Sequence, residues 1–303
     1  MVTNKLFHIY YEFWTIPLIM ILGSFVAGAS AEGGGAIAFP FFTLLLNIEP
    51  ASARNFAFAI QSIGMTSASL LIIGKKIPIE KKIIMYSSIG SLIGLTLGTF
   101  FLLDILPQKE TKLFFVSFWL SFALVLAFTT FRNSKCVHTN VNLDHIHDKL
   151  CVLIFGIIGG LITSLFGNGV DIITFCLVTL RFNLCEKVAT PTSVILMTIT
   201  TIFGFLLHLL IVKDFKNEEF IYWLSAIPIV VIFAPLGAYI IKFFSRELVA
   251  VFLISIIVIQ FIGGVFILRP LSIYQLTMCL STIVLGCLFF IIMHKKHKRK
   301  LHN

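Results

Sequence analysis

Ala27-Gly28-Ala29-Ser30-Ala31-Glu32-Gly33-Gly34-Gly35 breaks the first long apolar run of this chain, and Gly159-Gly160-Leu161-Ile162-Thr163-Ser164-Leu165-Phe166-Gly167-Asn168-Gly169 breaks another in its second half. Each break is followed by a short apolar stretch and then by a full-length hydrophobic segment. Irregular backbone at membrane depth persists only where protein or a wet cavity satisfies its N–H and C=O groups. Paired broken segments in two halves of a chain are the best sequence indication of a transporter's binding site. The pattern therefore predicts a membrane carrier for a small anion.

The composition excludes an ordinary soluble protein. Hydrophobic residues make up 58% of the 303 positions, 12% are charged, and the mean hydropathy is +1.01. A soluble domain carries about 25% charged residues. The net charge of +9 comes from short loops and from the basic run 294–300 that ends the chain, and such a run usually marks a cytoplasmic end in contact with anionic lipid. We therefore expect the lipid bilayer, and no nucleic acid, as a partner.

The cysteines and the N-terminus raise two smaller questions. The six cysteines contain no CxxC pair and are interpreted as small buried hydrophobes rather than disulfides or metal ligands. Lys5, the following apolar stretch and Ala29-Ser30-Ala31 are similar to a signal peptide with its cleavage site. Because the hydrophobic pattern continues past that site and cleavage would destroy one of the two broken units, we expect the segment to be retained.

Hydrophobic length predicts seven full spans and two broken units. About 20 apolar residues are needed to cross about 30 Å of hydrocarbon. The second arms of the broken units, 36–47 and 170–182, are too short to span, so each unit is a helix and half-helix hairpin or a pair of short tilted spans. The spans lie near 51–74, 83–103, 112–131, 187–212, 220–241, 248–268 and 271–293, and the broken units near 14–47 and 150–182.

Loop charge predicts the topology. Lys75, Lys76, Lys81 and Lys82 mark one loop as cytoplasmic, and the basic tail marks the C-terminus likewise. Both hold only if the second broken unit crosses the membrane an even number of times. If the first unit does the same, the two halves insert with opposite orientation, as inverted-topology repeats. We expect a multi-pass protein of the cell (inner) membrane with a first repeat at 1–131, a cytoplasmic linker at 132–149, a second repeat at 150–268, and an extra helix with the basic tail at 269–303.

The two breaks supply the predicted anion site. Glycine clusters let the backbone turn tightly and approach a ligand, and the half-helices from Ala36 and Val170 present unpaired N–H groups and the positive ends of their dipoles. The alternative is close helix packing through small residues, which we expect for the glycines from Gly23 to Gly28. The predicted substrate-binding residues are Ser30, Gly33, Gly34, Gly35, Gln61, Ser164, Gly167, Asn168, Gly169, Thr192 and Ser193.

Two acids near the breaks are candidates for a coupling ion. A carboxylate within the membrane costs several kcal/mol unless it is paired or protonated. Glu32 and Asp171 are therefore candidates to carry a coupling proton, with sodium as the other possible coupling ion. The alternative for Asp171 is a capping role in the first turn of its half-helix.

Other polar residues have simpler interpretations. Arg54 lies near a helix start, where it reaches the interface, pairs with Glu49 or contacts an anion. His208, deep in its apolar run, is expected to be buried, neutral and hydrogen-bonded; the alternative is a proton relay. Asp144-His145-Ile146-His147-Asp148 is only weak support for a metal site, so we expect no metal and no cofactor. The chain lacks GxSxG, Walker and HExxH motifs and is not expected to be an enzyme.

At these residues the chain resembles the sulfite exporter TauE/SafE family of membrane permeases. The resemblance covers nearly the whole chain and implies export or uptake of small sulfur-containing or organic anions such as sulfite or sulfonates. Glu32 stands where the family usually has a small residue. The residues that carry the resemblance are Gly33-Gly34-Gly35 through Pro40, Ala53-Arg54-Asn55-Phe56, Ile60-Gln61-Ser62-Ile63-Gly64-Met65, Gly167-Asn168-Gly169-Val170-Asp171 and Lys187-Val188-Ala189-Thr190-Pro191-Thr192-Ser193-Val194.

Three functions are compatible with the pattern. The leading hypothesis is a secondary transporter that moves a small anion by alternating access, the two repeats rocking about the broken hairpins. A passive anion channel is the close alternative, and coupled uphill flux separates the two. An intramembrane aspartyl protease, suggested by Gly169-Val170-Asp171, needs two facing acids at fixed motifs, and the acid spacing here does not fit that requirement.

Overall fold

Helices make up most of the structure, a computed structural model that describes residues 13–30, 35–103, 105, 107–131, 140–141, 143, 145–243, 246–269 and 272–300. The first half contains α2 (Thr15–Ala29), α3 (Gly35–Pro40), the π-helix η1 (Phe41–Leu45), α4 (Pro50–Gly74), α5 (Lys81–Phe101) and α6 (Gln108–Phe131). The rest contains α7 (Ile146–Phe166), α8 (Val170–Cys176), η2 (Leu177–Arg181), α9 (Glu186–Leu206), η3 (Leu207–Val212), α10 (Asn217–Ile240), η4 (Ile241–Phe243), α11 (Arg246–Leu268) and α12 (Ile273–Lys300).

Eight of the described helices are long and apolar enough to cross a membrane. Seven match the spans expected from hydropathy to within a few residues, and the eighth, Ile146–Phe166, is the first arm of the second broken unit. Helices close all backbone hydrogen bonds within themselves, which is why a chain this apolar folds this way in lipid. The prediction of an all-α polytopic membrane protein is confirmed.

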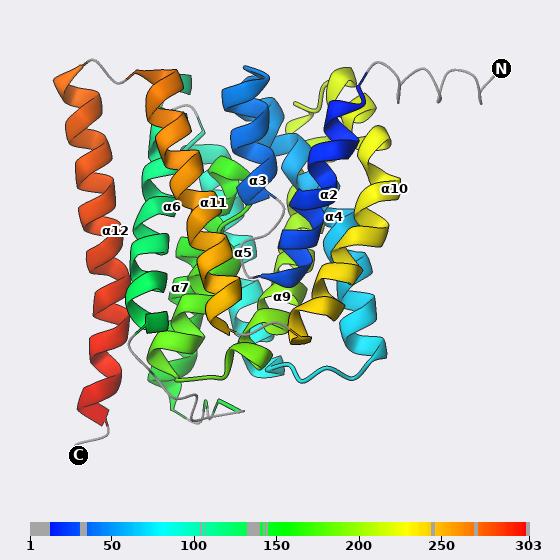
Figure 1. The fold of residues 1–303 in the computed structure, drawn as a ribbon. Helices are drawn as coiled ribbons and strands as arrows, with labels where there is room; N and C mark the ends of the chain where they lie inside the picture. Colours follow the sequence, from blue (N-terminus) through cyan, green and yellow to red (C-terminus); the bar gives the residue numbers. More distant parts are fainter. Residues whose placement is uncertain are drawn as a thin grey trace.

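The helices run between two faces of the molecule (Figure 1). We call the face with the loops 46–49 and 213–216 the upper face, and the face with the loops 75–80 and 182–185 the lower face. The helix α4 descends from the upper to the lower face and α5 returns, whereas α12 descends and ends at the lower face (Figure 1). The end of α12 and the lysine-containing loop 75–80 therefore lie on the same side, which is the side that the charge pattern marks as cytoplasmic.

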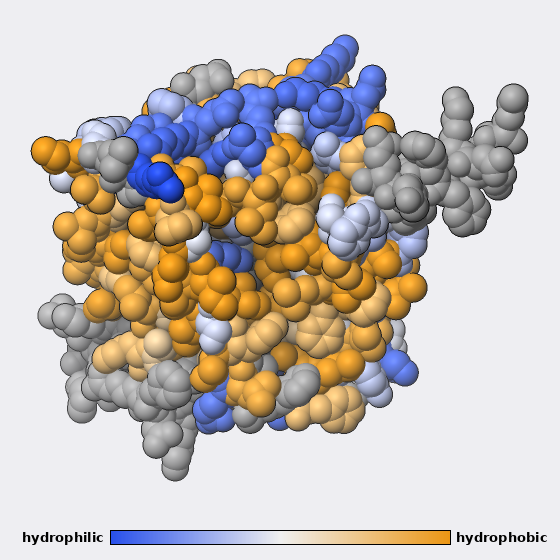
Figure 2. Space-filling view, turned by 45° about the horizontal axis from the view of Figure 1, so that its top comes forward, coloured by the Kyte–Doolittle hydropathy of each residue, from blue (hydrophilic) through white to orange (hydrophobic). Residues whose placement is uncertain are grey.

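The outer surface is largely apolar, as expected for a protein in contact with lipid. Figure 2 shows hydrophobic residues over most of the visible face and hydrophilic residues gathered along the rim that comes from the upper face. Only 28% of the apolar stretch of α12 that is long enough to cross the membrane is buried inside the protein. This helix packs against α6 and η2 and leaves most of its side chains to the bilayer.

Glycines let two pairs of helices touch backbone to backbone. The helix α5 packs along α7, where a Cβ at Gly94 would collide with the Ile157 carbonyl oxygen and one at Gly160 with the Ser91 carbonyl oxygen. The helix α2 packs along α10 in the same way, where a Cβ at Gly28 would collide with the Ala234 carbonyl oxygen. Helices in lipid associate through such close contacts of small residues, because the hydrophobic effect does not drive them together among equally apolar acyl chains.

These contacts correct the predicted extent of the breaks. Gly159 and Gly160 lie inside α7, which continues to Phe166, and Gly28 lies inside α2, which continues to Ala29. Their role is helix packing, and the chain turns only after them. Three hydroxyl pairs among the described residues join the halves elsewhere: Ser69 contacts Thr198 at 2.7 Å, Ser87 contacts Thr174 at 2.8 Å, and Ser91 contacts Thr200 at 2.9 Å.

Candidate functional site

The second break is a glycine turn whose backbone donors are already used. Gly167 and Gly169 have φ of 77° and 139°, values that favour glycine. The Gly169 N–H donates to the Asp171 carboxylate at 3.0 Å, and the Val170 N–H donates to the Thr163 hydroxyl at 3.0 Å. Asp171 thus caps its own half-helix, as the capping interpretation predicted. The carboxylate therefore accepts a hydrogen bond from one of the backbone N–H groups that the sequence analysis predicted to bind an anion.

Gln61 joins this turn to the other half of the protein. Its amide Nε2 donates to the Gly167 carbonyl and to the Ala57 carbonyl, both at 3.0 Å. A Cβ at Gly167 would lie 2.7 Å from Ala57 Cβ and 2.9 Å from the Arg54 carbonyl oxygen, so the turn rests directly on α4. Among the described residues, Gln61 Oε1 and Asp171 Oδ2 have no hydrogen-bond partner. Two buried acceptors therefore remain unsatisfied beside the break.

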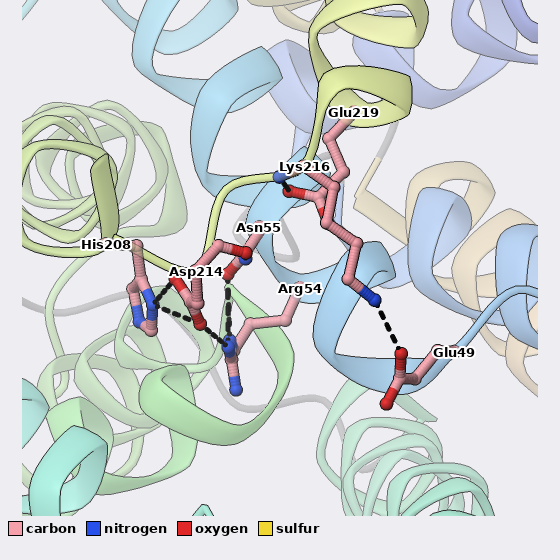
Figure 3. A network of polar contacts seen from close by, with 7 residues as sticks. All are labelled: Glu49, Arg54, Asn55, His208, Asp214, Lys216 and Glu219. Atoms are coloured by element: carbon pink, nitrogen blue, oxygen red, sulfur yellow. Dashed lines mark hydrogen bonds and ion pairs between the residues drawn. The ribbon is translucent and has the colours of Figure 1, made fainter. Parts of the chain in front are cut away.

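A cluster of polar side chains joins the start of α4 to η3 and the loop 213–216 (Figure 3). Arg54 Nη2 donates to Asp214 Oδ2 at 2.9 Å, and its Nε and Nη2 reach Asn55 Oδ1 at 3.2 and 3.1 Å. Asn55 Nδ2 donates to the Asp214 carbonyl at 3.1 Å, and His208 Nδ1 lies 2.9 and 3.1 Å from the two Asp214 carboxylate oxygens. We call Arg54, Asn55, His208 and Asp214 the upper cluster.

The upper cluster resolves the alternatives for Arg54 and His208. Arg54 is buried, and Asp214 is an ion-pair partner of its guanidinium. Glu49 pairs instead with Lys216 at 2.8 Å on the exposed rim, and this hydrogen bond with Glu49 raises the pKa of Lys216. His208 is fully buried and hydrogen-bonded, as expected from the sequence.

Asp214 is the residue that sequence reasoning missed. It follows η3 in the short loop 213–216, whose composition is that of a solvated turn. Burial alone would raise the pKa of its carboxyl, but the His208 hydrogen bond and the positive charge of Arg54 outweigh burial and hold the pKa below its ordinary value of 3.8. The available sequence signal for a polar cluster here was the number of charged residues between the spans 187–212 and 220–241.

This lowered pKa predicts an acid-dependent loss of stability. A carboxyl whose pKa is lower in the folded state than in the unfolded state stabilises the fold at pH values well above 3.8. That contribution is lost as the pH falls through the pKa of the folded state. We expect Asp214→Asn to lose this pH dependence, so that wild type and variant converge below about pH 3. Thermal unfolding in detergent between pH 3 and 7 measures the difference, with Glu49→Gln as the exposed control. A difference in melting temperature between wild type and Asp214→Asn that does not change with pH would contradict this prediction.

The remaining predicted site residues fall into three groups. Ser164, Gly167, Asn168 and Gly169 lie at the second break with Gln61 and Asp171, and the Ser164 and Asn168 side chains are buried. Gly35 begins α3, whereas Glu32, Gly33 and Gly34 lie outside the described residues. Several hydroxyls bind carbonyls of their own helices: Ser30 to Val26, Ser164 to Leu161, Thr192 to Val188 and Ser193 to Thr190.

Thr192 has a further contact near the lower face. Its hydroxyl accepts the Glu80 N–H at 2.9 Å, and Glu80 Oε2 in turn accepts the Val141 N–H at 3.0 Å. Thr192 therefore ties the loop 75–80 to α9 at the end of the molecule opposite the upper cluster. Among the described residues, no group of three His, Cys, Asp or Glu side chains is arranged to hold a metal ion.

The family comparison agrees with this architecture. The family model described as sulfite exporter TauE/SafE matches residues 16–263. The chain belongs to this family. The TauE/SafE match runs from α2 through the glycine break, the upper cluster and most of α11, and stops before α12. TauE/SafE proteins are membrane permeases rather than enzymes. No individual curated protein and no solved structure matches the chain.

Proposed function

We propose that this protein is a secondary transporter that moves a small anion, sulfite or a sulfonate or another small organic anion, across the cell membrane by alternating access. The TauE/SafE match over residues 16–263 carries the proposal. The buried glycine turn, which rests on α4 and is joined to it by the Gln61 hydrogen bond to the Gly167 carbonyl, supports it. A site of this kind is assembled between packed elements inside the molecule, which suits alternating access better than a continuous pore.

We propose further that residues 1–131 and 150–268 are inverted-topology repeats, with 132–149 as the linker and 269–303 as an addition. The packing pattern supports this division. The first hairpin helix of each half packs on a helix of the other half, α2 on α10 and α7 on α5, and α4 packs on α9 as α6 packs on α11. If the helices α2 to α6 correspond in order to α7 to α11, the contact of α2 with α10 is the counterpart of the contact of α7 with α5. In the other two pairs, each helix packs on its own counterpart, α4 on α9 and α6 on α11.

The substrate site is proposed between the two breaks. The second break rests on α4 at Arg54 and Ala57. The end of α2 lies beside a later part of α4, near Gly64, because Ala234 is close to both Gly28 and Gly64. At 1.5 Å per residue these levels are about 10 Å apart along α4. Glu32 and Asp171 remain the candidates for a coupling proton at this site. The lysine-containing loop 75–80 and the C-terminus would face the cytoplasm.

Reconstitution into liposomes tests the proposal. We expect purified protein to accumulate at least one of sulfite, thiosulfate, sulfoacetate or sulfate against its gradient, and a proton or sodium uncoupler to abolish the accumulation. Flux that only dissipates gradients would identify a passive channel instead. Absence of flux for every anion in the panel, from protein that is folded by size exclusion, would reject a transport function for these substrates.

Gln61→Leu is expected to slow uptake about tenfold. Leucine keeps the size of the side chain but removes the donor that holds the Gly167 carbonyl, and an unsatisfied buried carbonyl costs about 1–3 kcal/mol. The measurement is the initial rate of sulfite uptake, normalised to folded protein. Ser67→Ala on the same helix is the control, because the Ser67 hydroxyl binds only the Gly64 carbonyl of its own helix among the described contacts. Equal rates for the two variants would exclude Gln61 from the site.

A further inference from the structure

His208 is a buried ionisable group with one nitrogen satisfied and one open. It is 0% exposed and stacks on the Phe58 ring with centroids 5.4 Å apart. An ionised carboxylate only accepts hydrogen bonds, so Nδ1 carries the proton in the contact with Asp214. In the neutral ring Nε2 is then a bare acceptor, and it has no partner among the described residues. The ring is thus oriented by one contact and able to take up a second proton.

The charges around His208 balance until that proton arrives. Within the upper cluster, Arg54 and Asp214 carry one charge each and cancel, so a neutral His208 leaves the cluster neutral and a protonated one leaves it at +1. A buried net charge is unfavourable unless a partner compensates it. The other charged side chains near the cluster are Lys213 and Lys216 in the loop, Glu219 on α10, and Glu49, which pairs with Lys216.

A bound anion supplies the partner that Nε2 of a protonated His208 lacks among the described residues. Uptake of a proton at Nε2 creates both a buried positive charge and a buried N–H donor, and an anion supplies the opposite charge and an acceptor. By linkage, each ligand then raises the affinity for the other by the same factor.

We propose that His208, oriented by Asp214, binds a proton that is transported together with the anion. This inference rests on the proposed function and extends it, because it names the coupling ion and places its site on η3, apart from Glu32 and Asp171 at the breaks. The upper cluster then has two states: a neutral one without ligand, and one in which proton and anion are bound together.

Direct titration tests the proton site without any transport. The chain has eight histidines, and the ring signals of His208 are identified in NMR spectra of the whole protein in detergent by their loss in His208→Gln. We expect these signals to titrate, and the midpoint to rise when sulfite or methanesulfonate is added. A ring that stays neutral from pH 4 to 9, or a midpoint that neither anion moves, would overturn the inference.

Transport separates this inference from the proposed function. Methanesulfonate stays a monovalent anion throughout the pH range, whereas sulfite changes between its singly and doubly charged forms, so both are used. With one proton per monovalent anion, a gradient of one pH unit should drive about tenfold accumulation by the wild type. His208→Gln, and Asp214→Asn as a second variant, should accumulate neither anion, whereas the rim control Glu49→Gln should behave as wild type.

The outcomes are distinct. Tenfold accumulation by folded His208→Gln, or accumulation driven by sodium alone, would overturn the inference and leave the transporter in place. A loss of proton coupling in Asp171→Asn but not in His208→Gln would return the coupling site to the break and also overturn it. Absence of transport by the wild type would reject the proposed function, and the titration alone would then decide whether His208 couples a proton to an anion.

Discussion

Gly94→Leu is expected to abolish the folded state. The helices α5 and α7 touch along their backbones, and even a Cβ at Gly94 would collide with the Ile157 carbonyl oxygen and lie 2.8 Å from its carbon. A leucine forces the helices apart and opens the neighbouring contacts at Gly90, Gly156 and Gly160. Overpacking of one core site costs about 1–3 kcal/mol and occasionally more, and here a rigid interface has no flexible side chain to move aside. We expect Gly94→Leu to yield no monodisperse protein in detergent.

A matched glycine provides the control for this result. Gly263 lies inside α11, and a Cβ placed there has nothing within 4 Å. Gly263→Leu should therefore change stability by less than about 0.5 kcal/mol, as surface substitutions usually do. The smaller pair Gly94→Ala and Gly263→Ala should show the same order in thermal unfolding. If Gly94→Leu remained monodisperse with a melting temperature near that of Gly263→Leu, the backbone contact would not exist as described.

The packing of these helices shows what sequence could and could not predict. Hydropathy located the spans to within a few residues, because each must cover the same thickness of hydrocarbon. It did not distinguish glycines that break a helix from glycines that pack it: Gly160 was assigned to the break, yet it lies inside α7 against Ser91. The spacing of four residues in Gly90/Gly94 and Gly156/Gly160 is a small-xxx-small pattern, and it was the available signal for pairing α5 with α7.

The candidate site was predictable only in part. Gln61 and Gly167 were both named from the sequence, and the structure joins them with a hydrogen bond. Their pairing was not predictable, because it depends on how the second hairpin lies on α4. Asp214 was missed for a related reason. A single acid in a charged loop is ordinarily solvated, and only the fold brings it to Arg54, which is distant in sequence.

Arg54→Gln is expected to destabilise the protein by several kcal/mol and to stop transport. Arg54 is 4% exposed and contacts both Asn55 and Asp214. Removing one partner of a buried ion pair costs about 3–5 kcal/mol because the other charge stays behind. Since the Asp214 side chain is 31% exposed, water compensates part of that charge, and we expect about 2–3 kcal/mol. Unfolding in mixed micelles and sulfite uptake measure the two effects.

A double-mutant cycle isolates the pair. Arg54→Gln with Asp214→Asn removes both charges, so the double variant should be more stable than Arg54→Gln alone, with a coupling energy of about 1–3 kcal/mol. Its transport should stay low, because the cluster then has neither the cation nor the carboxylate that orients His208. Arg54→Lys keeps the charge but loses the planar fork that reaches Asn55 and Asp214 together, so it should recover stability more than activity. Strictly additive effects of the two single variants would show that Arg54 and Asp214 act independently.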